Sequence, residues 1–369
     1  MTKLSSFDSD KNMGEAWYAY AGSENDVVLS TRISLRRNLE NYAFPNAFKF
    51  DDAERIQALV LDSFSKIPQA EQYSTMAVKN LEGLGQRILM ERGIIHGSIM
   101  SEPMASLFIR SDGKLSGTVN VGDHVRLVSF VSGFNLEESF SLAKDLDDAL
   151  QEHLQFSCDL DFGYLTANIF ESGSGMKTSV LLHLPSVYAS GLLDKVFKEI
   201  LANNFAISGF YGGGRKDGSS LGSYYVLSSN NSLQGSEQTQ IEEFSLYVNQ
   251  LIDLERKLRK KLTDNEPTRL RDSIYRALAT VKFARYISAN EAIDLISRIK
   301  WGANLGILSG INDADLLALL FRTQTAHLQY ILQTSSIKYE KDVRTDEQKI
   351  ERLRSLLIQE AASKIQLIT

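Results

Sequence analysis

The hydrophobic pattern of this chain changes its period near residue 240, and that change restricts the folds it can adopt. Before residue 240, segments that alternate apolar and polar residues are interspersed with segments of helical spacing. From Ile241 onward only helical spacing remains. Elements in this order predict an α+β protein in which helices flank an antiparallel sheet and a helical region follows.

Local patterns place the individual elements. Alternating valines and leucines from Gly117 to Gly133 predict a long strand or a hairpin. A helix is expected at 53–67, with its apolar residues on one face, namely Ile56, Leu59, Val60 and Phe64. Further strands are expected at 176–184, 205–211 and 223–227, and further helices at 136–153, at 241–261, and after the capping boxes at Ser288 and Thr345.

Composition narrows the classes of partner and compartment. A formal net charge of −6 argues against general binding to nucleic acid or to anionic membranes. The first ten residues lack the apolar stretch of a signal peptide, and no run reaches about 18 apolar residues, so we expect neither secretion nor a membrane span. The single cysteine, Cys158, fits a reducing cytoplasm, and the five histidines show no metal-ligand spacing.

One strand-forming segment, residues 25–39, carries several positive charges. Arg32, Arg36 and Arg37 lie among β-prone residues, and burying such charges is costly unless an anion lies over them. One interpretation is a solvated edge strand, on which basic residues are common. The other is a strand that binds an anionic ligand.

The order of residues in this segment resembles a known motif. Residues 30–39 read S-T-R-I-S-L-R-R-N-L, which is similar to the phosphate-binding motif S-[ST]-R-I-R-L-A-R-N-L of the ATP:guanido phosphotransferases, or phosphagen kinases. The likeness is to their bacterial branch, the protein arginine kinases. Segments 136–150, 163–166 and 183–185 match linking segments of that branch, and Ala326–Gln329 matches its helical C-terminal domain.

The resemblance implies a guanido-kinase fold. It has a small N-terminal helical part, a large antiparallel sheet flanked by helices, and an all-helical C-terminal domain. On this basis residues 1–245 are expected to form a phosphagen-kinase-like domain, 246–264 a helical linker, and 265–369 a helical domain for dimerisation or binding.

The family's chemistry depends on two glutamates. Phosphoryl transfer to a guanidinium requires carboxylates that orient the acceptor and manage its proton. The family motif N-E-E-D-H-x-R reads N-V-G-D-H-V-R at 120–126, and R-G-x-x-G-E-G reads S-G-F-Y-G-G-G at 208–214. Both catalytic glutamate positions are lost, as Val121 (with Gly122 beside it) and Gly213.

The family also uses cations to hold the nucleotide phosphates. Of five basic positions that the resemblance assigns to this role, Arg32, Arg126 and Lys177 remain charged. The remaining departures from the family are Ser34 and Ser208, which replace arginines, and Asn168, which replaces the cysteine of the C-P-T-N-x-G loop. Losing one preorganised electrostatic group typically costs on the order of 10²–10³ in rate. The resemblance therefore implies a pseudokinase in which ATP with magnesium binds weakly.

Two nearby carboxylates are candidates to replace the lost glutamates. Asp123 already has an aspartate counterpart in the family motif, so it is not a spare group. Glu171 lies in the loop that normally carries the cysteine. An active ATP-dependent protein arginine kinase with a rearranged site is therefore the alternative interpretation.

A second motif of the branch, R-D-x-x-R-A, binds phosphoarginine in the helical domain. The matching residues here, 345–350, read T-D-E-Q-K-I. Asp346 is identical, and Lys349 keeps a charge without the bidentate fork of arginine. A plain helix N-cap at Thr345 explains the same residues.

The resemblance further implies a role and partners. The leading hypothesis is a binding or regulatory subunit in the stress response and protein quality control of bacteria. Expected partners are a Clp unfoldase, a zinc-finger activator or an active kinase paralogue, together with homodimerisation through the helical domain. A third reading is a purely structural dimer.

Overall fold

The computed structural model describes residues 16–368 except 98, 100, 101, 103, 213–218, 231, 233 and 234. Among these residues the main sheet has eight strands, in the order β2-β3-β4-β5-β1-β8-β10-β9, and every neighbouring pair is antiparallel. Its strands are β1 (Val28–Arg37), β2 (Tyr73–Ala77), β3 (Ser106–Arg110), β4 (Leu115–Val121), β5 (Asp123–Ser132), β8 (Met176–His183), β9 (Phe205–Gly209) and β10 (Tyr224–Ser229). Two-residue strands form separate pairs, β6 (Cys158–Asp159) with β7 (Gly163–Tyr164), and β11 (Leu308–Ser309) with β12 (Gln366–Leu367).

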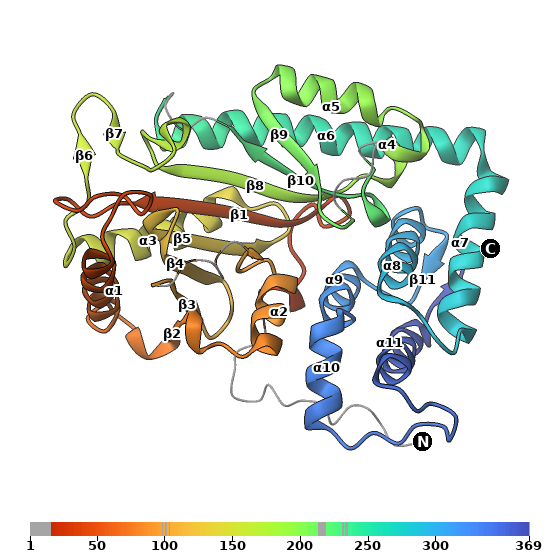
Figure 1. The fold of residues 1–369 in the computed structure, drawn as a ribbon. Coiled ribbons are helices and arrows are strands. Elements are labelled where there is room, and N and C mark those ends of the chain that lie inside the picture. The colour runs from red at the N-terminus through yellow and green to blue at the C-terminus, as the bar shows by residue number, and fades with distance from the viewer. Residues whose placement is uncertain are drawn as a thin grey trace.

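One group of helices flanks this sheet, and a second group follows it toward the C-terminus (Figure 1). The first group is α1 (Phe50–Phe64), α2 (Gly83–Glu91), α3 (Leu136–Gln151), α4 (Pro185–Ala189), α5 (Leu193–Ala202) and α6 (Glu237–Asn265). The second group is α7 (Pro267–Phe283), α8 (Ala289–Asn304), α9 (Asp313–Arg322), α10 (Thr325–Thr334) and α11 (Asp346–Ala362). No helix of the described residues is long and apolar enough to cross a membrane.

Strand β1 lies in the middle of the sheet, between β5 and β8. Both of its edges are therefore hydrogen bonded, and the interpretation of its arginines as a solvated sheet edge is wrong. Because side chains alternate along a strand, Ile33 and Leu35 point to one face, whereas Arg32 and Arg36 point to the other. The same strand thus contributes both to the hydrophobic core and to a cationic surface.

The two faces of the sheet are covered differently. On the first face, Ile33, Leu35 and the matching residues of the other strands pack against α1, α3, α5 and α6 in the largest hydrophobic core. On the second face, Phe130 and Leu181 join a core formed mainly by α7–α9 and α11. The side chains of Arg32 and Arg36 lie on the same second face.

Several predicted elements are confirmed, with adjusted bounds. The predicted segment 117–133 corresponds to the β4–β5 hairpin, which ends at Ser132 and turns at Gly122 with a positive φ of 75°. Helix α1 buries Ile56, Val60 and Phe64, whereas Leu59 is 43% exposed at the edge of that face. At 3.6 residues per turn Leu59 lies roughly 100° from the centre of the buried stripe.

The guanido-kinase architecture predicted from the motif order is confirmed in its antiparallel sheet, flanking helices and helical C-terminal region. Two details differ. Between residue 16 and β1 there is only the short 3-10 turn η2 (Trp17–Ala19) in place of a helical part, and residues 1–15 lie outside the described part. The helical region also contains the β11–β12 pair, which joins the chain after α8 to its end. The proposed domain boundaries at 245 and 264 stay predictions, and α6 runs through both positions without a break.

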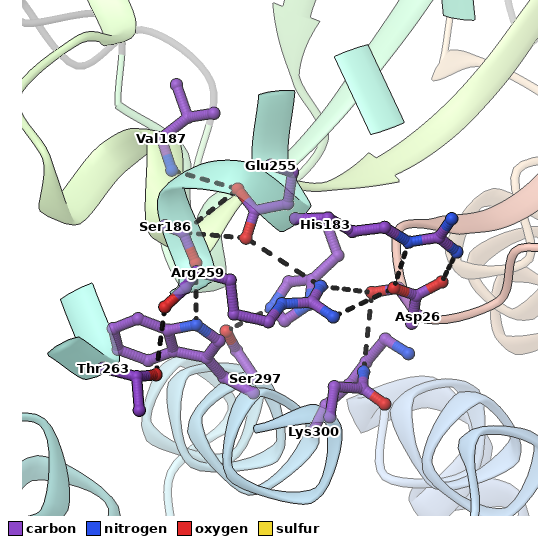
Figure 2. A network of polar contacts seen from close by, with 12 residues as sticks. Asp26, His183, Ser186, Val187, Glu255, Arg259, Thr263, Ser297 and Lys300 are labelled. Carbon is purple, nitrogen blue, oxygen red and sulfur yellow. Dashed lines mark hydrogen bonds and ion pairs between the residues drawn. The ribbon is translucent and has the colours of Figure 1, made fainter. Parts of the chain in front are cut away.

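A buried polar network joins the sheet to the helical region (Figure 2). The Glu255 carboxylate on α6 accepts the backbone N–H groups of Ser186 and Val187 at 3.0–3.1 Å, at the start of α4. Lys300 on α8 donates to the backbone oxygen of Asn25 at 2.5 Å and pairs with Asp313. These contacts link α6 to α4, and α8 to the loop before β1, where the two cores meet.

His183 lies inside the same network and is held neutral. Its Nε2 lies 2.8 Å from Ser297 Oγ, which donates to the Gly222 carbonyl at 2.7 Å. Burial, followed by the charges of Lys300 and Arg259, holds the pKa of His183 well below its usual value of 6.5.

We predict that His183 makes the protein sensitive to acid. A histidine with a depressed folded pKa contributes stability above its unfolded pKa of about 6.5, and that contribution is lost as the pH falls below this value. His183→Gln keeps an N–H donor without the titrating ring, so its unfolding free energy should fall less between pH 6.5 and pH 5. Urea unfolding at several pH values measures this, and His153→Gln, at an exposed position, is the control. Equal acid sensitivity of both variants would disprove the assignment.

Arg37 ends β1 on its core face and is neutralised there. Its guanidinium forms a bidentate pair with Asp147 of α3 at 2.8 and 3.0 Å, and both side chains are fully buried. It also donates to the Arg36 and Ser174 carbonyls and lies 3.5 Å above the Tyr164 ring. One side chain thereby fastens β1 to α3 and to the chain around β7.

Removing Arg37 should be strongly destabilising. Arg37→Met leaves the Asp147 carboxylate buried without a countercharge, which typically costs about 3–5 kcal/mol of unfolding free energy. The double variant Arg37→Met/Asp147→Leu should recover part of that loss, because it buries no unpaired charge. Lys66→Ala, which breaks an exposed pair with Asp62, is the control and should change stability by less than about 1 kcal/mol. Denaturant unfolding distinguishes these outcomes.

Candidate functional site

A group of cations lies on the second face of the sheet, on its three central strands. Arg36 of β1 lies directly opposite Arg126 of β5, and Ser34 of β1 lies directly opposite Lys177 of β8. Arg32 lies two residues before Ser34 on β1, on the same face, and is directly opposite Phe130 of β5. The structure therefore brings together Arg32, Arg126 and Lys177, the three cations that the sequence assigned to one site.

Arg32 is half-buried and has no anionic partner in the described part of the chain. Its guanidinium lies over the Phe130 ring at 5.2 Å, and its Nη2 has no hydrogen-bond partner among the described residues. Burial, then the neighbouring charges of Arg126 and Arg36, lowers the pKa of Arg32 to about 9. A cation in this state is stabilised by any anion that enters beside it.

Arg126 also has an unsatisfied donor, and its pKa is lowered by a smaller amount than that of Arg32. Its Nε is buried and has no hydrogen-bond partner among the described residues. Burial and the charge of Arg36 lower the pKa of Arg126 to about 10, although Glu171 and Asp123 act in the opposite direction. Two neighbouring guanidinium groups thus offer unused donors on one side of this cationic site.

The other side of the cationic site is already neutralised by carboxylates. Glu171, at the end of the 3-10 turn η6 (Ile169–Glu171), pairs with Arg36 and lies 3.6 Å from Lys177. Asp123 lies 3.5 Å from Arg36 and accepts hydrogen bonds from Asn38 and from the backbone N–H of Ala167, both at 2.7 Å. Both carboxylates that could replace the lost glutamates therefore already have cationic or hydrogen-bonding partners.

The remaining predicted positions are distributed around this cluster. Ser34 is buried between Val128 and Lys177 on the adjoining strands, and no guanidinium reaches the site from it. Ser208 lies on the outer strand β9, separated from β8 by β10, and is exposed. Gly213 lies outside the described residues.

Two positions that the family uses for catalysis serve local structure here. Val121, at the end of β4, packs against a small apolar cluster that includes Val78, Ile95 and Leu107. Asn168 caps η6, since its side chain accepts the Phe170 N–H. Neither side chain brings a charge to the cationic site.

Sequence reasoning did not include Arg36 among the site residues. The family motif has alanine at this position, so its replacement by arginine beside the loss at Ser34 was the available signal. Its partner Glu171 replaces an asparagine of the family's C-P-T-N-x-G loop. His96 was also missed, although its pKa is lowered by burial and by the charges of Arg32 and Arg126.

The predicted phosphoarginine-binding residues lie elsewhere, at the start of α11. Thr345 forms a reciprocal capping box with Gln348, so the N-cap interpretation is confirmed. Asp346 pairs with Lys349 within the helix at 3.0 Å, and the Asp346 side chain is largely exposed. Whether these two residues bind phosphoarginine stays a prediction.

This fold is that of a guanido kinase, and sequence comparison agrees. The chain belongs to the ATP:guanido phosphotransferase family: residues 55–258 match the family described as "ATP:guanido phosphotransferase, C-terminal catalytic domain". Residues 267–366 match the "Protein-arginine kinase McsB C-terminal domain".

Similar proteins include protein-arginine kinases of several bacteria. The chain is 32% identical to that of Syntrophomonas wolfei over 83% of this chain and 86% of the relative. It is 30% identical to that of Clostridium novyi over 96% of this chain and 100% of the relative. Identity to the Bacillus subtilis protein is 28%, over 89% and 90% of the two chains.

Solved structures support the fold. A lombricine kinase superposes with a TM-score of 0.56 at 16% identity, covering 68% of this chain and 75% of that one. The duplicated taurocyamine kinase of Schistosoma mansoni has a TM-score of 0.56 at 19% identity, over 63% of this chain and 33% of that one. At these identities the likeness concerns the fold alone.

The residues present fit part of a nucleotide. The unused donors of Arg32 and Arg126 suit one phosphate group, whereas Arg36 and Lys177 are engaged by Glu171. The side chains of the cationic site include four cations and two carboxylates, which leaves an excess of two positive charges (4 − 2 = 2). This favours a compact anion over a long polyphosphate.

Neutralising Glu171 should strengthen anion binding. Glu171→Gln removes the internal competitor and frees Arg36 and Lys177, so affinity for pyrophosphate and ATP should rise roughly tenfold, equivalent to about 1.4 kcal/mol. Titration calorimetry with each ligand measures the change. Glu152→Gln, an exposed carboxylate at the end of α3, is the matched control and should leave affinity unchanged. Unchanged binding in Glu171→Gln would show that Glu171 does not occupy the anion site.

Proposed function

We propose that this protein is a catalytically impaired relative of the protein-arginine kinases that keeps an anion-binding site and acts by binding. The observation that carries the proposal is the absence of a free carboxylate among the described residues of the cationic site. Val121 and Gly122 stand where the family motif has glutamates, and Asp123 and Glu171 are engaged by Arg36 and its neighbours. Without an oriented carboxylate the acceptor guanidinium keeps its proton and is a poor nucleophile.

The loss of cations supports the same proposal. An arginine that holds a phosphate contributes charge-assisted hydrogen bonds of about 1.5–3 kcal/mol each. Ser34 and Ser208 supply none. ATP with magnesium is therefore expected to bind weakly, through Arg32, Arg126 and Lys177, and transfer geometry is expected to be poorly defined.

One observation favours the alternative of an active kinase with a rearranged site. Glu171 does bring a carboxylate into the cationic site, within reach of Arg36 and Lys177. If an incoming nucleotide displaced it from these cations, Glu171 would become available to an acceptor guanidinium. The active-kinase alternative predicts that Glu171→Gln abolishes phosphoarginine formation. The proposal of an impaired kinase predicts that the unmodified protein already lacks this activity.

The proposed biological role rests on family membership. A binding or regulatory subunit of bacterial protein quality control, in the cytoplasm, would act through a Clp unfoldase, a zinc-finger activator or an active kinase paralogue. Homodimerisation through residues 265–369 belongs to the same proposal. Co-purification with each class of partner, and light scattering of the purified chain, test these points separately.

The unmodified protein should not form phosphoarginine at the rate of its active relatives. Val121→Glu with Gly213→Glu should not be sufficient to restore transfer, because the nucleotide is still poorly held. Activity should require arginines at positions 34 and 208 as well, through Ser34→Arg and Ser208→Arg, each group contributing on the order of 10²–10³ in rate. Phosphorus NMR of a protein substrate, with the Bacillus subtilis relative as positive control, measures the product. Robust phosphoarginine formation that Glu171→Gln abolishes would overturn the pseudokinase proposal and support the alternative.

A further inference from the structure

Large apolar side chains are exposed on two adjacent segments beside the cationic site. Leu160 is fully exposed, and Phe162 is 62% exposed, at the tip of the β6–β7 hairpin. Ile169 and Phe170 of η6 are 70% and 64% exposed. Figure 1 shows the hairpin standing away from the body, beyond the ends of β1 and β8. Single exposed apolar residues are common, but a group of this size on projecting segments is typical of a protein-binding surface.

These two segments are joined and ordered. The backbone groups of Tyr164 and Gly173 bond reciprocally at 2.8 and 3.1 Å, which links β7 to the residues after η6. Asp159 closes the hairpin tip by accepting the N–H groups of Asp161 and Phe162 at 2.8 and 3.1 Å. The Tyr164 ring is held under Arg37. The apolar side chains are therefore presented on a defined turn.

The root of the hairpin supplies a concave part to this surface. A cavity of about 540 Å³ lies between the C-terminal end of α3 and the hairpin, and its lining includes Leu154, Phe156 and Tyr164 together with Glu152. Most of its other lining residues are polar, so the root offers a partner segment polar contacts, including the Glu152 carboxylate, beside the apolar tip.

The negative charge of this region indicates which kind of partner segment the surface can bind. Residues 145–176 contain no lysine or arginine and seven acidic residues, at 145, 147, 148, 152, 159, 161 and 171. Glu152, Asp159 and Asp161 are exposed, and within the described part of the chain none of them forms an ion pair. Such a surface attracts basic segments and disfavours acidic ones.

We propose that the β6–β7 hairpin with η6 is a docking surface for a basic amphipathic segment of a partner protein, in which arginines or lysines alternate with leucines or aromatic residues. The surface ends at Glu171, so the docked segment lies beside the cationic site. It uses neither Arg32 nor Arg126, and its occupation does not depend on nucleotide binding or on phosphoryl transfer.

The test is the binding of a peptide to the full chain in the absence of nucleotide, measured by fluorescence anisotropy. The probe is a labelled 16-residue peptide of alternating arginine and leucine or phenylalanine. Two comparison peptides replace all arginines by glutamate, or all apolar residues by serine. Leu160→Ser/Phe162→Ser should weaken binding of the probe at least tenfold, and Glu152→Lys/Asp161→Lys should weaken it most at low salt.

The matched control is Leu246→Ser/Phe283→Ser, which removes apolar side chains of similar exposure (67% and 77%) from α6 and α7. It should leave binding unchanged. Equal affinity for the glutamate peptide, or equal losses in the control and the hairpin variant, would overturn the proposal. So would a dimer in light scattering that only the hairpin variant converts to monomer, because the surface would then serve a second copy of this chain.

Discussion

The position of β1 at the centre of the sheet is the constraint on which the rest of the structure depends. With β5 and β8 bonded to its two edges, β1 directs Ile33 and Leu35 into the main core and Arg32 and Arg36 to the opposite face. The alternation also sends Arg37 to the core face. A charge there requires a buried countercharge, and Asp147 of α3 supplies it with two hydrogen bonds. The same strand therefore orients the helix behind the sheet and the cations in front of it.

The cationic site on that second face differs from a working phosphoryl-transfer site in how its charges are paired. A transfer site needs cations left free for phosphate and carboxylates left free for the acceptor. Here Arg36 and Glu171, both departures from the family motifs, pair with each other. Arg32 and Arg126 keep unused donors. This combination supports anion binding with little provision for chemistry, and it leaves the projecting hairpin next to Glu171 as a separate means of contacting a partner.

The helical region is joined to the sheet by buried polar groups as well as by apolar packing. The Glu255 carboxylate accepts backbone N–H groups at the start of α4, and Lys300 donates to a backbone carbonyl in the loop before β1. Such groups contribute little net stability when paired, but each is costly when its partner is removed. They consequently specify one arrangement of the two cores, which keeps His183 neutral at their junction.

The sequence by itself determined the local elements and the family. The period change near residue 240, the alternation at 117–133 and the motif order predict the α+β fold, and they place Arg32, Arg126 and Lys177 in one site. Only the tertiary structure decided which charges meet. Arg37 and Asp147 lie 110 residues apart in the chain, and Glu171 reaches Arg36 from another loop. Periodicity reports which face a side chain takes, whereas pairing depends on strand register and on loops whose path no local pattern encodes. For that reason Glu171 was recognised as a candidate carboxylate, while its neutralisation by Arg36 was not.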